Sequence, residues 1–205
     1  MNLLGWTATF GPDPDLETEL AEPRADADAA TRGLWVTPDR ATLGVLFYRA
    51  CEWLASGAAD GGERARVLFK TTTDAYRATG NRDLIPVALG LWSEAERRCG
   101  DLEKARTLAR EATSLLEQGA PSLLNESPAF IALHDVELEG GDESAAKIAV
   151  ERGMALLRRR LRSLEGTPYA RVFLSGLPYN DRLLRRAKEY GLVPPEVLAA
   201  LDRER

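Results

Sequence analysis

The sequence predicts an all-α protein: a right-handed α-solenoid of about three helical hairpins, with capping helices at the C-terminus and an irregular arm at the N-terminus. Three observations lead to this class. Apolar residues recur at helical spacing from residue 40 onwards. A Gly-Asp pair occurs twice, at Gly100-Asp101 and Gly141-Asp142, 41 residues apart. That interval falls within the ~34–47 residues of known two-helix repeats.

Each Gly-Asp pair predicts the turn of a hairpin. A helix often ends on a glycine that adopts the left-handed conformation, and aspartate is a favoured N-cap for the next helix. Five residues beyond each glycine stands an alanine, Ala105 or Ala146, which lets two antiparallel helices approach closely. The pattern therefore pairs 83–99 with 101–118 and 126–140 with 142–165, after a first hairpin of 40–56 and 62–79.

The apolar residues predict which side of each helix is buried. In 40–56 the buried face is Leu43, Leu46, Phe47, Ala50 and Leu54, and in 62–79 it is Val67, Leu68, Thr71, Ala75 and Ala78. Asp83 is the expected N-cap of the third helix, which tolerates Pro86 in its first turn and buries Ile85, Leu89, Trp92 and Ala95.

The helix at 142–165 combines an apolar stripe with a run of arginines. Its predicted buried residues are Val150, Met154, Leu157, Leu161 and Leu164. The other faces carry Arg152, Arg158, Arg159, Arg160 and Arg162, which either form a solvated face paired to acidic residues or contact phosphates. We favour the solvated face, since no aromatic residues alternate with the charges.

Three parts are expected: an acidic arm at 1–39, the repeats at 40–165 and the capping helices at 166–205. The arm is rich in Pro, Asp and Glu, and its first residues include the apolar anchors Leu3, Leu4, Trp6 and Phe10. These anchors are expected to pack on the body of this chain or in a groove of another. The alternating Asp13, Asp15, Glu17 and Glu19 lack the glycine of a calcium loop, because residue 18 is Thr.

Composition and charge indicate a soluble, cytoplasmic protein. The two cysteines are far apart and lack metal-ligand spacing, which favours a reducing compartment, and no stretch is apolar enough for a signal peptide or a membrane span. The net charge of −5 divides unevenly, with 13 basic and 7 acidic residues from Lys147 to Arg205 and 14 basic and 25 acidic before them. The two ends of the chain could attract each other or a partner of opposite charge.

The repeat region resembles the tetratricopeptide repeat (TPR) superfamily. Leu43, Gly44 and Phe47 are similar to the first-helix signature of that superfamily, and GDLEKARTLAREA at 100–112 is similar to its turn and second helix. The resemblance implies a divergent, extended member whose groove is lined by the first helix of each hairpin.

The C-terminal segment also resembles a known sequence motif. This motif is found at the end of the helical arms of large bacterial regulators such as signalling kinases and ATP-dependent transcription activators. The residues that carry it are Arg171, Phe173, Leu174, Pro178, Asn180, Leu183 and Leu184. This resemblance implies a freestanding arm whose effector is another polypeptide, a bacterial effector or signalling protein.

Few residues point to catalysis, a metal or a cofactor. His134 is the single histidine, three residues before Glu137, and no second histidine or nearby cysteine completes a ligand set, so a packing histidine is the better interpretation. Cys51 and Cys99 are interpreted as buried structural thiols. No phosphate-binding glycine loop or nucleophile motif occurs. We therefore expect no enzyme activity, no metal and no cofactor.

The sequence favours a non-catalytic adaptor or regulatory subunit that binds a protein or peptide in a TPR-like groove or through its arm. The candidate partner-binding residues are Tyr48, Arg49, Glu94, Arg97, Arg98, Asp135 and Glu139, with Trp6 and Phe10 of the arm. Two alternatives stay open: a sensor of a small ligand or signal peptide, and a nucleic-acid-binding protein that uses the Arg158–Arg162 surface.

Overall fold

The described residues of this protein form nine helices and no strand, so the expectation of an all-α protein is confirmed. The structure is a computed structural model, and it describes residues 40–120, 126–164, 167 and 169–202. The helices are α4 (Arg40–Ala55), α5 (Gly61–Ala78), α6 (Ile85–Arg98), α7 (Leu102–Glu117), α8 (Ser127–Glu139), α9 (Glu143–Arg162), α10 (Tyr169–Ser175), α11 (Pro178–Glu189) and α12 (Pro195–Asp202). Trp6, Phe10 and the other predictions for the arm lie outside the described residues.

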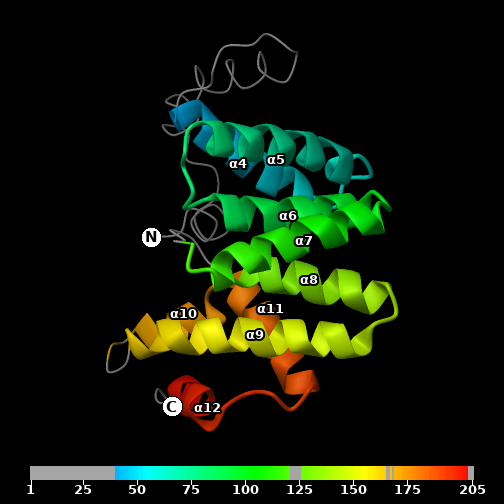
Figure 1. Ribbon diagram of the computed structural model, residues 1–205. Coiled ribbons are helices and arrows are strands. Elements are labelled where there is room, and N and C mark those ends of the chain that lie inside the picture. The colour runs from blue at the N-terminus through cyan, green and yellow to red at the C-terminus, as the bar shows by residue number, and fades with distance from the viewer. Residues whose placement is uncertain (1–39, 121–125, 165–166, 168, 203–205) are drawn as a thin grey trace.

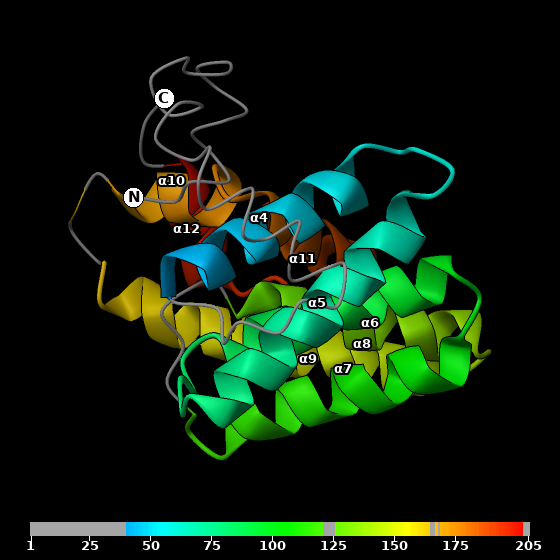
Figure 2. The ribbon, with the colours of Figure 1, turned by 90° about the horizontal axis from the view of Figure 1, so that it is seen from above.

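Successive helices pack as hairpins that follow one another along the stack (Figure 1). The hairpins are α4–α5, α6–α7 and α8–α9, and α6 and α8, the first helices of the second and third hairpins, contact each other directly. Helix α11 packs on α8 and α9, and α10 packs on α11 and α12. Seen from above, α4, α10 and α11 lie on one side of the molecule and α5 and α7 on the other (Figure 2).

The Gly-Asp turns behave as predicted. Gly100 and Gly141 have φ of +86° and +83°, the left-handed conformation that ends α6 and α8. The carboxylate of Asp101 accepts a hydrogen bond from the Lys104 amide at 3.1 Å, and that of Asp142 accepts one from the Ala145 amide at 2.8 Å. Both aspartates are therefore N-caps, as expected from the sequence.

Small residues allow close helix contacts. Ala105 and Ala146 are fully buried, as predicted from their equivalent places in the two hairpins. Gly90 marks a still closer approach, because a Cβ added there would lie 2.8 Å from both the backbone nitrogen and the Cα of Ala129. The backbones of α6 and α8 thus meet at Gly90, one turn before Glu94.

The buried face of α5 differs from the prediction. Val67 is 50% exposed and Ala78 is also exposed, so placing these two residues in the core was wrong. Helix α5 contacts both α4 and α6, and its buried arc is centred between these two neighbours. This arc contains larger side chains than the predicted one: Ala65, Leu68, Phe69, Thr72, Thr73 and Tyr76.

Two helix ends also differ from the prediction. The N-cap of α6 is Leu84 rather than Asp83, and no side chain caps this end of the helix. Helix α9 ends at Arg162, so Leu164 is only half-buried. The other predicted core residues of α4, α6 and α9 are buried. No helix in the described ranges has both the length and the apolarity needed to cross a membrane.

Candidate functional site on the charged face of α6, α8 and α11

Two nearly buried carboxylates occupy equivalent places in consecutive hairpins. Glu94 on α6 and Asp135 on α8 are 41 residues apart, the same interval as the Gly-Asp turns. They are 4% and 8% exposed, and we refer to them as the acidic pair. Burying a charge is costly unless cations and hydrogen bonds compensate it, so the surroundings of the acidic pair decide what it can do.

Glu94 is held by arginines of its own helix. Its Oε1 accepts from Arg98 Nε at 3.1 Å, from Arg98 Nη2 at 2.9 Å and from Arg97 Nη2 at 3.3 Å. Arg98 also donates to the carbonyl of Leu54, near the end of α4. Glu94 and Arg98 therefore fasten α6 to the first hairpin.

Asp135 is held by the C-terminal helix α11. Arg182 forms an ion pair with Asp135 Oδ2 and lies 3.9 Å from Glu94 Oε2, so one guanidinium is shared by the two members of the acidic pair. Arg186, one turn further along α11, lies 3.8 Å from Asp135 Oδ1. The charged face of α6 and α8 is thus covered by a segment of the same chain.

His134 is a packing residue, as the sequence indicated. It is 1% exposed, its Nδ1 lies 2.7 Å from Asp135 Oδ1, and its Nε2 lies 3.3 Å from the Tyr190 hydroxyl. Glu137 points elsewhere, since it accepts from Arg106 and Arg110 of α7 at 3.1 and 2.8 Å. Across the ranges the structure describes, no group of three or more His, Cys, Asp and Glu could hold a metal ion.

The surroundings of Asp135 lower its pKa. Burial raises the pKa of Asp135. The hydrogen bond from His134 and the charges of Arg182, His134 and Arg97 lower it by more, so the pKa of Asp135 is below the usual 3.8. A carboxyl whose pKa is lower in the folded state adds stability above its unfolded pKa. That stability is lost as the pH falls through the folded pKa.

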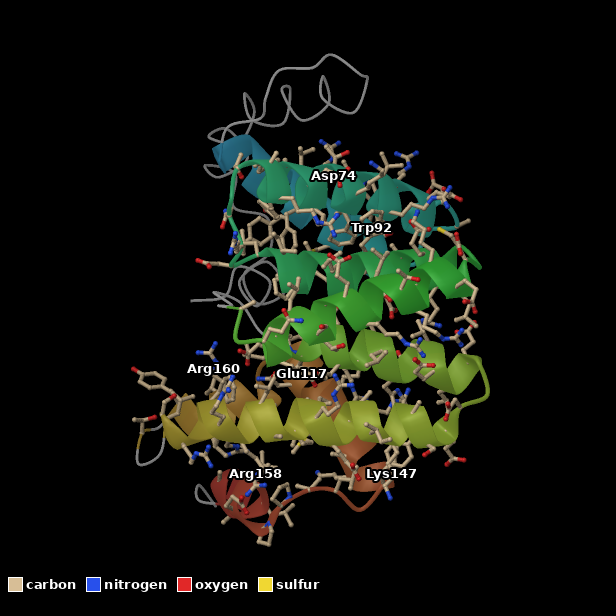
Figure 3. All side chains as sticks on the ribbon, in the orientation of Figure 1. Asp74, Trp92, Glu117, Lys147, Arg158 and Arg160 are labelled. Carbon is tan, nitrogen blue, oxygen red and sulfur yellow. The ribbon has the colours of Figure 1, made fainter. Side chains whose placement is uncertain are left out.

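We expect Asp135→Asn to lower the free energy of unfolding by about 1.5 kcal/mol at pH 7. This loss is smaller than for a fully buried ion pair, because Arg182 and Arg186 regain water when Asp135 loses its charge. The difference from wild type should shrink as the pH falls below the usual pKa of 3.8 and through the lower folded pKa of Asp135. Urea denaturation between pH 3 and 7 measures it, with the exposed Asp74→Asn on α5 as control (Figure 3). An equal loss at every pH would contradict the argument.

The structure brings together five of the seven predicted groove residues. Glu94, Arg97, Arg98, Asp135 and Glu139 form one network, in which Arg97 connects Glu94 to Glu139 Oε2 at 2.8 Å. Tyr48 and Arg49 are half-buried on α4, where the Tyr48 ring packs edge-on against Phe47 at 5.8 Å between centroids.

The sequence analysis missed the residues of α11 that complete the face. Arg182 and Arg186 pair with Asp135, and Tyr190 contacts His134. Tyr179 packs against the core of the first two hairpins, and burial raises its pKa. One feature of the sequence could have indicated them: Arg182 and Arg186 are spaced one helical turn apart, in the helix that contains the Pro-x-Asn motif.

A second set of charges fixes the opposite side of α6. Glu96 is 1% exposed and accepts from the Trp92 indole at 2.6 Å, while Lys104 and Arg66 approach it at 2.5 and 3.5 Å. Trp92 lies between α5 and α6 (Figure 3). Glu96 therefore ties its own helix to the helices before and after it, whereas Glu137, 41 residues later, ties α8 only to α7 before it.

The arginine run of α9 is largely engaged within the chain. Arg152 pairs with Glu117, Arg158 with Glu196, and Arg160 with Glu126 at 2.9 Å. Figure 3 shows Arg158 directed towards α12 and Arg160 on the opposite side of α9. These pairs agree with the interpretation of a solvated, ion-paired face.

The two cysteines differ in exposure. Cys51 is buried, and burial together with the charge of Glu52 raises its pKa to about 12. Cys99 is half-buried, so describing it as a buried thiol was wrong. Its pKa is raised by burial and by the charge of Glu63, and the charges of Arg66 and Lys104 oppose this shift.

We expect Cys99 to react with iodoacetamide at pH 8 in the folded protein, and Cys51 to react only after denaturation. A thiol with a pKa near 12 is thiolate in about one molecule in 10⁴ at that pH. Mass spectrometry of alkylated peptides measures this order, and Cys99→Ser should abolish labelling of the folded chain. Equal labelling of both thiols would show that α4 opens readily.

Comparison of the chain with protein-family models, curated proteins and solved structures found no match.

Proposed function

We propose that this chain is a non-catalytic, TPR-like adaptor or regulatory subunit that binds a partner protein or peptide. The supporting observation is that α11 packs on α8 and α9 and reaches Glu94 of α6 through Arg182. Arginines of α11 pair there with a buried acidic pair, so this face already binds one helix of its own chain.

The proposed partner contacts the part of this face that α11 leaves accessible. The side chains of Arg97, Arg98 and Glu139 are 23%, 41% and 49% exposed, and Tyr48 and Arg49 of α4 are half-buried. Glu94 holds the guanidinium groups of Arg97 and Arg98 in fixed positions, which lowers the entropy lost when a partner binds them. Fixed guanidinium groups suit the carboxylates of an acidic peptide segment.

The surroundings of two residues considered as catalytic candidates, His134 and Cys51, favour a non-catalytic role. His134 is enclosed between Asp135 and Tyr190, and the pKa of Cys51 is near 12, so this thiol is a weak nucleophile at neutral pH. Both side chains contribute to packing between helices.

The test begins with affinity capture from the native host, followed by calorimetry with the purified partner. Arg49→Glu should weaken binding of an acidic partner segment by about tenfold or more, because it reverses the charge of a proposed partner-binding residue on α4. Lys70→Glu is the matched control, since Lys70 is 61% exposed on α5 and makes the same change of charge. It should leave the affinity within about twofold.

Two results would contradict the proposal. One is turnover of a substrate by the purified chain alone. The other is binding of DNA of any sequence, with a steep salt dependence that Arg159→Glu and Arg162→Glu abolish. That second result would support the nucleic-acid alternative instead.

A further inference from the structure

An apolar surface remains uncovered at the C-terminal end of the described structure. Tyr169 and Val172 are 66% and 60% exposed and lie three residues apart on α10, hence on one side of that helix. Leu198 of α12 is 43% exposed. Helices α10 and α12 pack against each other through the core that contains Leu174 and Val197.

Basic side chains adjoin these apolar residues. Arg159 and Arg162 are exposed on the last turns of α9, and only residues 163–168 separate α9 from α10. The pair between Arg158 and Glu196 places the start of α12 against the same part of α9. Figures 1 and 2 show the end of α9, α10 and α12 at one corner of the molecule. We call Tyr169, Val172, Leu198, Arg159 and Arg162 the C-terminal face.

Residues 1–39 have the complementary chemistry. Their apolar residues Leu3, Leu4, Trp6 and Phe10 come first, and a stretch with Asp and Glu at seven positions follows from Asp13 to Asp28. The whole segment contains 8 acidic and 2 basic residues, whereas Lys147 to Arg205 contain 13 basic and 7 acidic residues. An apolar and then acidic segment thus matches an apolar and basic surface.

We propose that residues 3–28 of this chain dock on the C-terminal face, with the apolar residues covering Tyr169 and Val172 and the acidic stretch facing Arg159 and Arg162. Length permits this contact. The 39 residues before α4 reach roughly 130 Å when extended, whereas a stack of three helix layers is about 30 Å high. The proposal does not depend on the proposed function.

Two arguments favour this segment over a second copy of the C-terminal face. A twofold contact of that face with itself would bring like charges together, which is unfavourable. A tethered segment, by contrast, has an effective concentration in the millimolar range with respect to its own chain, so weak contacts suffice.

The experiment is photo-crosslinking in the full-length chain. Phe10→p-benzoylphenylalanine places the crosslinker within the proposed apolar contact, and mass spectrometry then locates the crosslinked peptide. We expect crosslinks within one chain to residues 169–175 or 195–202. Crosslinks to α4–α8, crosslinks between two chains, or no specific crosslink would overturn the proposal.

Variants in the crosslinking chain test the two halves of the contact separately. Val172→Glu should lower the yield of these crosslinks by about tenfold, and Val67→Glu, at a position 50% exposed on α5, should leave the yield unchanged. Arg159→Glu with Arg162→Glu should lower the yield and remove its dependence on salt. Circular dichroism confirms that each variant is folded. Equal yields in all variants would overturn the proposal.

Discussion

Gly90→Ala is expected to lower the free energy of unfolding by about 3 kcal/mol. The new Cβ would lie 2.8 Å from backbone atoms of Ala129, and a backbone cannot move aside as a flexible side chain can. Helices α6 and α8 would have to separate at this point. The acidic pair lies on these two helices, so we also expect weaker pairing of Arg182 with Glu94.

Gly44→Ala is the matched control for this prediction. Gly44 is also inside a helix, but a Cβ there would meet nothing within 4 Å. Alanine is a better helix former than glycine, so this variant should gain about 0.5–1 kcal/mol. Chemical denaturation of both variants measures the two free energies of unfolding. Similar values would show that the contact between α6 and α8 is not as close as described.

Asn180→Ala should be similarly destabilising, again by about 3 kcal/mol. Asn180 is fully buried, donates to the Phe173 carbonyl at 2.6 Å and accepts from the Ser127 hydroxyl at 2.6 Å. Alanine would remove both hydrogen bonds at a fully buried position, and the loss of a buried hydrogen-bond partner costs about 1–3 kcal/mol. The junction of α8, α10 and α11 would lose its polar contacts.

Ser175→Ala provides the comparison for Asn180→Ala. Its hydroxyl also donates to a backbone carbonyl, that of Arg171, but Ser175 is exposed and water can replace the bond. We expect a change within about 0.5 kcal/mol. Thermal unfolding followed by circular dichroism separates the two variants. A small effect of Asn180→Ala would mean that water enters the junction.

The parts of the fold that depend on local sequence were predictable. The left-handed glycines, the aspartate caps and the buried alanines are determined by residues within a single turn or hairpin. Predicted and observed ends of the six hairpin helices therefore differ by at most three residues. The face of α5 was not predictable in the same way, because two neighbouring helices determine which of its sides is buried.

The residues of the candidate site on α6 and α8 were predictable from the sequence, but the helix α11 that packs over them was not. The phase of the repeats placed Glu94 and Asp135 on one face, and the structure shows both connected to Arg182. The position of α11 could not be inferred, because it depends on contacts between residues 47 or more positions apart. Asn180 is part of the C-terminal motif identified in the sequence, but its hydrogen bonds to Ser127 and Phe173 could be seen only in the structure.

The bridge formed by Arg182 has a consequence for synthesis on the ribosome. In an array whose units contact only their neighbours, each unit can reach its final state soon after it emerges. Here Asp135 of the third hairpin gains its ion pair only when Arg182, 47 residues later in the chain, has been translated. The acidic pair in the middle of this protein is therefore completed by a helix that is translated after all three hairpins.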